Sequence, residues 1–266
     1  MASIGPTAHY TGQVWTRHGL SHPELATTEG RALYLAAEAA LLPLRLLGQP
    51  SLEGFLLARH LVIDELLGEA IAAGRVGQVL EIACGLSPRG WRFTERHPDL
   101  VYVEADLPAM AARKRAALER IGRPDTHRVA EIDALAADGP LSVSAVVAEQ
   151  MDSAKGLAVI TEGLLNYLSP SALRALWSNV AGVADLYLSD LFVAGDTPQL
   201  VGRAFSAALA GFVRSPISLH FRDADEARRA LLAAGFADAE VSRAADHPAA
   251  PARPGADLVR IISARR

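Results

Sequence analysis

From residue 78 onward, short apolar runs alternate with longer amphipathic stretches. The runs cover residues 78–83, 101–105, 127–132, 157–161 and 184–191. The stretches between them have helical spacing, and several begin with Pro or Ser: residues 89–96, 108–121, 142–151 and 169–180. This alternation is typical of a parallel sheet with helices wound between its strands.

The end of the sequence departs from this alternation. A helix is predicted over residues 224–234, and two apolar runs follow at residues 239–243 and 258–263 with no helical pattern between them. We therefore expect these runs to pair as an antiparallel hairpin, whose long loop contains the Pro- and Ala-rich segment 247–255. Parallel strands that end in a hairpin predict an α/β, Rossmann-like fold of the class I methyltransferase type, because a plain dinucleotide-binding sheet has no such hairpin.

The first part of the sequence carries helical spacing only. Two helices are predicted over residues 28–47 and 51–73, separated by Gly48-Gln49-Pro50. We therefore expect a helical N-terminal cap over residues 1–75 and a cofactor-binding domain over residues 76–266.

Residues 193–221 stand between the fifth predicted strand and the last predicted helix. They show no strand pattern and include Phe205, Phe212 and Pro216. We expect this segment to be a lid insertion over the substrate.

Composition and charge exclude several classes of function. The formal net charge is −4 at pH 7, so the sequence offers no overall positive field for a nucleic acid. The N-terminus has neither a basic nor an apolar leader segment, and no apolar run is long enough to span a membrane, so we expect a cytoplasmic protein. The single cysteine, Cys84, excludes an internal disulfide and is expected to be a small packing residue. The sequence does not indicate an oligomeric state.

A turn of small residues follows the first predicted strand. It runs from Glu81 to Gly90 and leads into a helix. Ligands of open α/β sheets bind beyond the carboxyl ends of the strands, where a glycine lets the ligand approach the backbone, so Gly85 is the expected contact. The turn lacks the three glycines of the dinucleotide fingerprint, so a pyrophosphate is not favoured. A strand, turn and helix without any ligand would have the same pattern.

Carboxylates follow the ends of the next two predicted strands. Asp106 lies twenty-one positions after Gly85, where a carboxylate can accept both hydroxyls of a ribose. Glu104 is the second choice for this role, and its alternative is a solvated carboxylate at the sheet edge. Asp133 could accept the amino group of an adenine, or it could be a helix cap or a solvated loop residue.

Glu162 emerges from the fourth predicted strand. A buried carboxylate is costly unless it is paired, and a sulfonium cofactor would bring a positive sulfur and an ammonium group to it. The alternative is a structural ion pair with Arg59 or Arg89.

Together these motifs resemble the leucine carboxyl methyltransferase family, and most closely its bacterial branch of O-methyltransferases associated with polyketide biosynthesis. The resemblance covers nearly the whole chain. The motifs that carry it are Arg59-His60 with Asp64, residues 78–92, residues 102–106 and Thr161-Glu-Gly-Leu-Leu-Asn-Tyr-Leu168.

The resemblance implies S-adenosyl-L-methionine as the cofactor. Arg59 would bind the carboxylate of its methionine part, Gly85 would pass its backbone beneath it, and Asp106 would hold the ribose. The resemblance also implies that Asp133 and Ala134 flank the adenine and that Glu162 lies near the methionine end. The further candidate cofactor contacts are Glu81, Arg89 and Glu104. The family commonly has an acidic residue where this chain has Ser87.

The predicted activity is transfer of a methyl group to a carboxylate or hydroxyl oxygen of a small molecule, either a polyketide-like compound or a peptide. The transfer is an in-line displacement that needs alignment and no metal. A hydroxyl acceptor would profit from a base, and the candidate catalytic residues are Tyr10, His9 and His220. Expected acceptor contacts are Tyr10, Trp15 and Tyr167, since residues 10–15 match a region that closes over the site in this family.

Other interpretations of these residues stay open. The histidines of the cap and lid, which also include His18 and His60, could be capping or surface residues. Tyr10 and Trp15 could simply anchor an N-terminal helix to the sheet. A nicotinamide-dependent oxidoreductase would use a similar sheet, and a non-catalytic S-adenosylmethionine-binding protein would carry the same binding residues.

Overall fold

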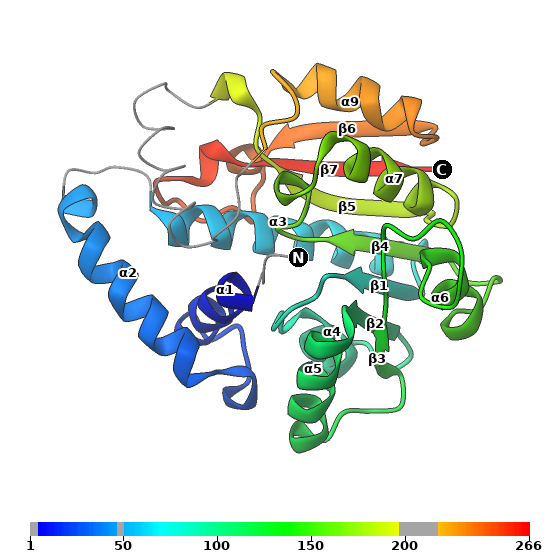
Figure 1. Cartoon of the computed structure of the whole chain (residues 1–266), viewed down its shortest axis with the longest axis horizontal. Coiled ribbons are helices and arrows are strands. Elements are labelled where there is room, and N and C mark those ends of the chain that lie inside the picture. The colour runs from blue at the N-terminus through cyan, green and yellow to red at the C-terminus, as the bar shows by residue number, and fades with distance from the viewer. Residues whose placement is uncertain (1–4, 47–50, 197–217) are drawn as a thin grey trace.

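Seven strands form a single mixed sheet in the order β3-β2-β1-β4-β5-β7-β6 (Figure 1). The structure is a computed structural model that describes residues 5–46, 51–196 and 218–266. The strand bounds are β1 Gln78–Ile82, β2 Val101–Asp106, β3 His127–Glu131, β4 Leu157–Thr161, β5 Leu186–Leu191, β6 Asp238–Arg243 and β7 Arg260–Arg265. Strands β1 to β5 are parallel, whereas β7 is antiparallel to both β5 and β6.

This arrangement confirms the predicted fold class. The expected C-terminal hairpin is present, with Val241 paired to Ile262. The last strand begins at Arg260, two residues later than predicted, because residues 256–258 form a 3-10 turn first.

Helices cover both faces of the sheet. Their bounds are α3 Leu52–Ala72, α4 Arg89–Arg96, α5 Pro108–Ile121, α6 Val143–Gln150, α7 Pro170–Ala181 and α9 Ala224–Ala233. Val79 and Tyr102 pack with α3 and α4 on one face, and Leu80 and Val103 pack with α6, α7 and α9 on the other. Successive strand residues face opposite sides, so Glu81 and Glu104 lie on the α3 face.

Helix α3 is buried almost all round, as expected of a helix that packs in the interior. Phe55 of this helix shares one hydrophobic core with Val79 of the sheet and Tyr10 of the N-terminal helix. The predicted N-terminal cap and the sheet therefore share one hydrophobic core. The division of the chain near residue 75 stays a prediction.

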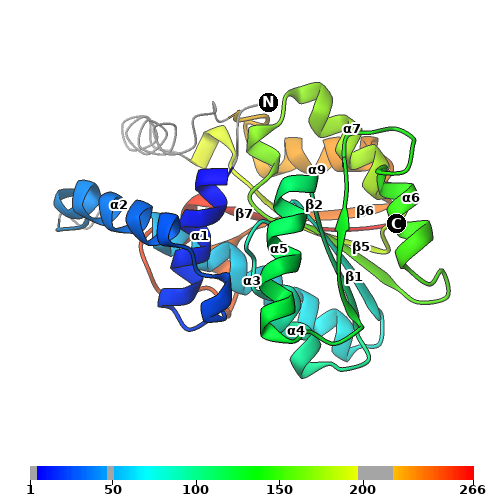
Figure 2. The same cartoon turned by 60° about the horizontal axis from the view of Figure 1, so that its bottom comes forward.

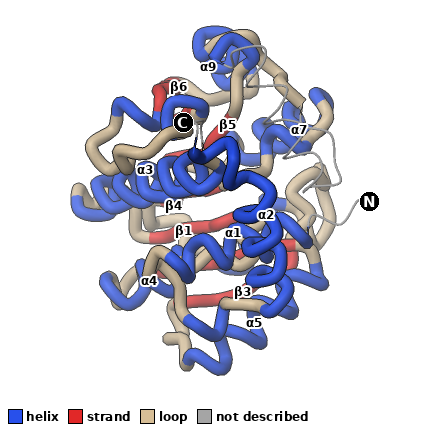
Figure 3. The backbone as a smooth tube through the Cα atoms, turned by 90° about the vertical axis from the view of Figure 1, so that its left-hand side faces the viewer, coloured by secondary structure: helices blue, strands red, loops and turns tan. Residues whose placement is uncertain are grey.

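The N-terminal region contains α1 (Gly5–Arg17) and α2 (Thr28–Leu46). The bounds of α1 are not evident from the sequence, because its two glycines and three threonines give it a low helix propensity. Packing compensates, since Tyr10, Val14 and Trp15 are buried. Both helices lie on the side of the sheet where β1 to β5 end, and α2 extends from the body of the protein (Figures 2 and 3).

The predicted lid over residues 193–221 lies largely outside the described residues. Its two ends are described, and they pair with each other. The backbone N–H of Ala194 donates to the carbonyl of Phe221, and that of Gly195 donates to the carbonyl of Arg222. Within the described parts of the chain, no helix combines the length and hydrophobicity that a membrane span requires.

Candidate functional site

The turn after β1 has an unusual backbone. Ala83 and Gly85 both have left-handed φ angles, of 55° and 51°. Such a conformation is uncommon for a residue with a side chain, and strained backbone of this kind concentrates at functional sites. The backbone N–H of Gly85 donates to Oδ2 of Asp106 at 2.8 Å, and that of Leu107 donates to Oδ1 at 2.8 Å. The structure thus brings the predicted pair Gly85 and Asp106 together.

Burial raises the pKa of Asp106, and the two backbone N–H donors act against that rise. The carboxylate is therefore oriented by the turn itself. Asp106 itself is only partly buried.

Helix α1 lies directly over this turn. A Cβ atom at Gly85 would stand 3.1 Å from Cβ of Ala8, and a Cβ atom at Gly12 would stand 3.3 Å from Cβ of Leu86. Glycine on each side therefore permits the close approach of helix and turn.

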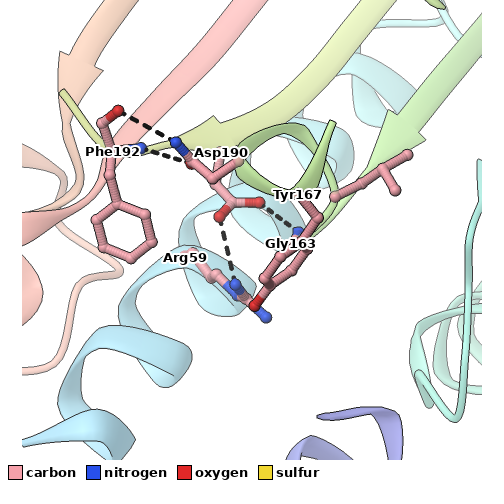
Figure 4. A pocket seen from close by; sticks show the side chains of 7 residues that line it. Arg59, Gly163, Tyr167, Asp190 and Phe192 are labelled. Carbon is pink, nitrogen blue, oxygen red and sulfur yellow. Dashed lines mark hydrogen bonds and ion pairs between the residues drawn. The ribbon is translucent and has the colours of Figure 1, made fainter. Parts of the chain in front are cut away.

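Arg59 of α3 lies between the carboxylates of Glu162, just after β4, and Asp190, near the end of β5, and Figure 4 shows its contact with Asp190. Its Nε donates to Oε1 of Glu162 at 3.0 Å, and its Nη1 donates to Oδ2 of Asp190 at 3.3 Å. The guanidinium also lies over the ring of Phe55, with 5.0 Å between Cζ and the ring centroid. Although burial opposes it, the charges of Asp190 and Glu162 raise the pKa of Arg59.

Arg89 of α4 joins three carboxylates at the centre of a buried network, and Glu162 is one of them. Its Nε donates to Asp64 at 2.6 Å, its Nη1 to Glu81 at 2.7 Å and its Nη2 to Glu162 at 2.5 Å. The side chain has no exposed surface. Both structural ion pairs considered for Glu162 are therefore present, with Arg59 and with Arg89.

His60 and Tyr102 complete this network. Nδ1 of His60 lies 2.9 Å from Oε2 of Glu162, and the hydroxyl of Tyr102 donates to Oε2 of Glu81 at 2.7 Å. Burial raises the pKa of Glu162, but His60 and Arg89 outweigh it and hold that pKa well below its usual range. For Glu81 burial is the stronger effect, and its pKa is raised.

Glu104 belongs to a second buried cluster beneath the turn. Its carboxylate lies 3.0 Å from Nζ of Lys114 and 3.1 Å from Nε2 of His127, and none of the three side chains is exposed. The alternative of a solvated edge carboxylate is therefore wrong for Glu104. Nζ of Lys114 also donates to the carbonyl of Ser87, so this cluster supports the turn from below.

The turn after β3 lies beside Asp106. The backbone N–H of Ile132 donates to the carbonyl of Asp106 at 3.0 Å, which places the next residue, Asp133, at the neighbouring strand end. The carboxylate of Asp133 accepts the backbone N–H of Leu135, and the carbonyl of Ala134 accepts the side chain of Asn179. Gly85, Asp106 and Asp133 therefore follow adjacent strands at one edge of the sheet.

The candidate acceptor residues of α1 are buried. Trp15 stacks on His60 with 4.2 Å between ring centroids, and Tyr10 stacks on Tyr34 at 5.9 Å. These contacts anchor the helix to α3 and α2. Trp15 thereby connects α1 to the network around Glu162.

The candidate histidines have partners within the protein. Nδ1 of His9 lies 2.9 Å from the hydroxyl of Thr27, and burial lowers the pKa of His9. Nε2 of His220 lies 3.1 Å from the carbonyl of Leu165. Nε2 of His18 lies 3.4 Å from Oε1 of Glu53, in the first turn of α3.

A small pocket opens beside Arg59, with about 240 Å³ of empty space including its mouth. Its lining combines cationic, acidic and aromatic groups and consists of Arg59, Gly163, Leu164, Asn166, Tyr167, Asp190 and Phe192. Sequence reasoning selected Arg59 and Tyr167 and missed Asp190 and Asn166. Their positions in the sequence could have indicated them. Asp190 lies near the end of the buried strand β5, and Asn166 follows the buried strand β4, four positions after Glu162.

Two further observations concern the chemistry of the site. Within the described ranges, no three His, Cys, Asp or Glu side chains are grouped in a way that could hold a metal ion. Cys84 is buried and burial raises its pKa well above its usual value, which fits the predicted packing role.

The sheet order, the glycine turn and the acidic strand ends define a protein of the class I methyltransferase fold. A family model described as leucine carboxyl methyltransferase matches residues 24–181, more than half of the 266 residues. The chain belongs to the leucine carboxyl methyltransferase family. Its membership of the polyketide-associated branch stays a prediction.

Curated relatives occur in mycobacteria. A protein of Mycobacterium sp. (strain JLS) named "Putative S-adenosyl-L-methionine-dependent methyltransferase" is 38% identical over 117 residues, which are 43% of this chain and 37% of that protein. A protein of the same name from Mycobacterium bovis (strain BCG / Pasteur 1173P2) is 32% identical over 166 residues, or 61% and 49% of the two chains. The matched part of the chain thus spans less than half the length of these relatives.

Solved structures share the fold. The crystal structure of a "putative methyltransferase" from Thermobifida fusca YX covers 97% of this chain and 94% of its own, with a TM-score of 0.67 and 15% identity. Magnesium protoporphyrin IX methyltransferase from Synechocystis PCC 6803, with S-adenosylhomocysteine bound, covers 82% and 89%, with a TM-score of 0.51 and 15% identity. At such identities the likeness concerns the fold alone.

Proposed function

We propose that the chain binds S-adenosyl-L-methionine and transfers its methyl group to a carboxylate or hydroxyl oxygen of a small molecule. The observation that carries this proposal is the placement of Gly85 with Asp106 and of Arg59 with Glu162 beyond the carboxyl ends of neighbouring parallel strands. Ligands of open α/β sheets bind at this edge. Family membership and the names of the relatives support the same cofactor.

The residues present suit this cofactor. A half-buried carboxylate with a fixed orientation, such as Asp106, can accept two ribose hydroxyls. Gly85 has no side chain, so the backbone of the turn is open to close approach by a ligand at this position. Arg59 offers a cation for the carboxylate of the methionine part, and Glu162 offers an anion near the ammonium.

We assign a supporting role to the three predicted contacts that are fully buried. Glu81, Arg89 and Glu104 have at most 1% of their surface exposed, and each is paired within the protein. They hold the turn and Glu162 in place without touching a ligand themselves.

When bound, S-adenosylmethionine supplies a methyl group on a positively charged sulfur, which is an activated leaving group. The chain's own contribution is alignment and the exclusion of water. Trp15 and Tyr10 hold α1 over the strand ends and thereby close that side of the site. Tyr167 lines the pocket beside Arg59, and we place the acceptor oxygen on the Tyr167 side of it.

A carboxylate acceptor fits this site better than a hydroxyl. A carboxylate arrives deprotonated and needs no base, whereas a hydroxyl would profit from a base such as a free histidine nitrogen. His9 is engaged by Thr27 and Arg113, and His220 by a backbone carbonyl. A polyketide-like acid or a peptide carboxylate is therefore the proposed acceptor, and its product would be an ester that mild alkali cleaves. A methyl product that survives mild alkali would instead identify an ether.

Titration of the chain with S-adenosylhomocysteine and with NADH tests the cofactor. We expect saturable calorimetric binding of S-adenosylhomocysteine and none of NADH, since the turn lacks the dinucleotide glycines. Binding of NADH alone would favour a nicotinamide-dependent oxidoreductase. If S-adenosylhomocysteine binds but labelled methyl never reaches any carboxylate or hydroxyl acceptor, the chain is a non-catalytic binding protein.

A further inference from the structure

Asp190 stands at the end of β5 and is only 2% exposed. Its Oδ1 accepts the backbone N–H of Gly163 at 2.6 Å, and its Oδ2 accepts Nη1 of Arg59 at 3.3 Å (Figure 4). A carboxylate buried to this degree is costly unless it is paired. Asp190 therefore joins three elements, namely β5, the turn after β4 and helix α3.

These contacts leave Arg59 little freedom. Glu162 holds Nε and Asp190 holds Nη1, while a Cβ atom at Gly163 would stand 2.7 Å from Nη2. Gly163 has a φ of 67°, so the turn is shaped to let the guanidinium pack against its backbone. The orientation of the guanidinium is thus fixed by the hydrogen bonds to Glu162 and Asp190 and by the backbone of Gly163.

One nitrogen of this guanidinium is left for a ligand. Nη2 of Arg59 makes no hydrogen bond to any residue in the parts of the chain that the structure describes. Arg59 lines the pocket, so a ligand carboxylate bound there could accept from its guanidinium.

We propose that Asp190 is a positioning residue that fixes the guanidinium of Arg59 for the carboxylate of the cofactor's methionine part. The inference rests on the proposed function, because it needs a cofactor with that carboxylate. It goes beyond that function in assigning a role to Asp190, whose two carboxylate oxygens bond to Arg59 and to Gly163.

The chain supplies a matched control at the opposite end of the same strand. Asp185, just before β5, also accepts one backbone N–H, from Leu157 at 2.9 Å, and one arginine, Arg266, at 3.0 Å. Asp185→Asn removes the same negative charge and weakens the same kinds of contact, at the end of the strands that lies away from the site.

The test compares Asp190→Asn and Asp185→Asn in calorimetric titrations with S-adenosylhomocysteine and with 5′-methylthioadenosine. The second ligand shares the adenosine and the sulfur but lacks the carboxylate and the ammonium. We expect Asp190→Asn to weaken S-adenosylhomocysteine binding by about tenfold, the size of one charge-assisted hydrogen bond, and methylthioadenosine binding by less than about twofold. Asp185→Asn should change neither affinity.

The outcomes separate this role from the proposed function. If the wild-type chain binds neither ligand, the proposed function fails. If it binds both and Asp190→Asn keeps its affinity for S-adenosylhomocysteine, only the role of Asp190 is wrong. An equal loss for both ligands also contradicts that role, because it would report general damage to the site. Should Asp190→Asn fail to fold, Asp190→Glu retains the buried charge with a displaced carboxylate, and the same selective loss is expected of it.

Discussion

At the scale of the residue, Arg89 is the cation on which the largest group of buried carboxylates depends. It pairs with Asp64, Glu81 and Glu162 and has no exposed surface. Removing one partner from a buried ionic network leaves uncompensated charge, which costs more than the net value of the pair.

We predict that Arg89→Met lowers the free energy of unfolding by about 3 to 5 kcal/mol, because three carboxylates lose a partner. Urea unfolding followed by circular dichroism measures this. The control is Arg96→Met in the last turn of the same helix, where the side chain is exposed and a change of less than about 0.5 kcal/mol is expected. Equal losses in both variants would contradict the central position of Arg89.

The low pKa of Glu162 predicts a dependence of stability on pH. A carboxyl whose pKa falls on folding contributes stability above its unfolded pKa, which is near 4.5 here, and that contribution is lost as the pH falls toward the folded value. The wild-type free energy of unfolding should therefore decline more steeply below about pH 5 than that of Glu162→Gln. Parallel curves for the two proteins between about pH 5 and about pH 3 would count against this explanation.

A site residue could be predicted from the sequence when the strand it follows was recognisable. It could not be predicted when its importance depends on partners that reach it only through tertiary packing. Gly85, Asp106 and Glu162 follow strands that were recognisable as apolar runs, so their placement at one edge was predictable. The partners of Glu104 were not, because Lys114 and His127 meet it only through the packing of α5 and β3 against β2. Asp190 was missed for the same reason, since its significance comes from Arg59, 131 positions earlier.

At the scale of the element, α1 shows how packing overrides local preference. Its sequence is a weak helix former, yet Tyr10, Val14 and Trp15 are almost fully buried against the remainder of the protein. The strands and most helices of the sheet were delimited to within one or two residues by their apolar runs. Helix α1 was not, because tertiary contacts stabilise it.

We predict that Trp15→Ala loosens α1, because the indole stacks on His60 and fills the core between α1 and α3. The cost should be about 3 to 5 kcal/mol, the usual range for truncating a buried Trp. Limited proteolysis should then cleave within α1 before the rest of the chain. Trp91→Ala serves as the control, since Trp91 is only half-buried on α4. Equal protease resistance of α1 in the wild type and Trp15→Ala would contradict this packing role.

At the scale of the whole molecule, the proposed ligand connects elements that are far apart in the sequence. Its expected contacts come from α3, the turns after β1 and β3, and the ends of β2 and β4. A ligand that binds only the folded chain stabilises all of these elements together.

S-adenosylhomocysteine at about one hundred times its dissociation constant should therefore raise the free energy of unfolding by about 2.7 kcal/mol. The shift appears as a higher urea midpoint with an unchanged slope. NADH at the same concentration serves as the control and should leave the midpoint in place.

The central claim is that Asp106 and the turn at Gly85 form the cofactor site, and calorimetry on matched aspartate variants tests it most directly. Asp106→Ala removes the carboxylate that the N–H of Gly85 orients, whereas Asp99→Ala removes an exposed carboxylate before the amino end of the same strand. We predict that Asp106→Ala weakens S-adenosylhomocysteine binding by at least about tenfold while the protein stays folded, and that Asp99→Ala binds as the wild type does. Unchanged binding by folded Asp106→Ala would contradict the account.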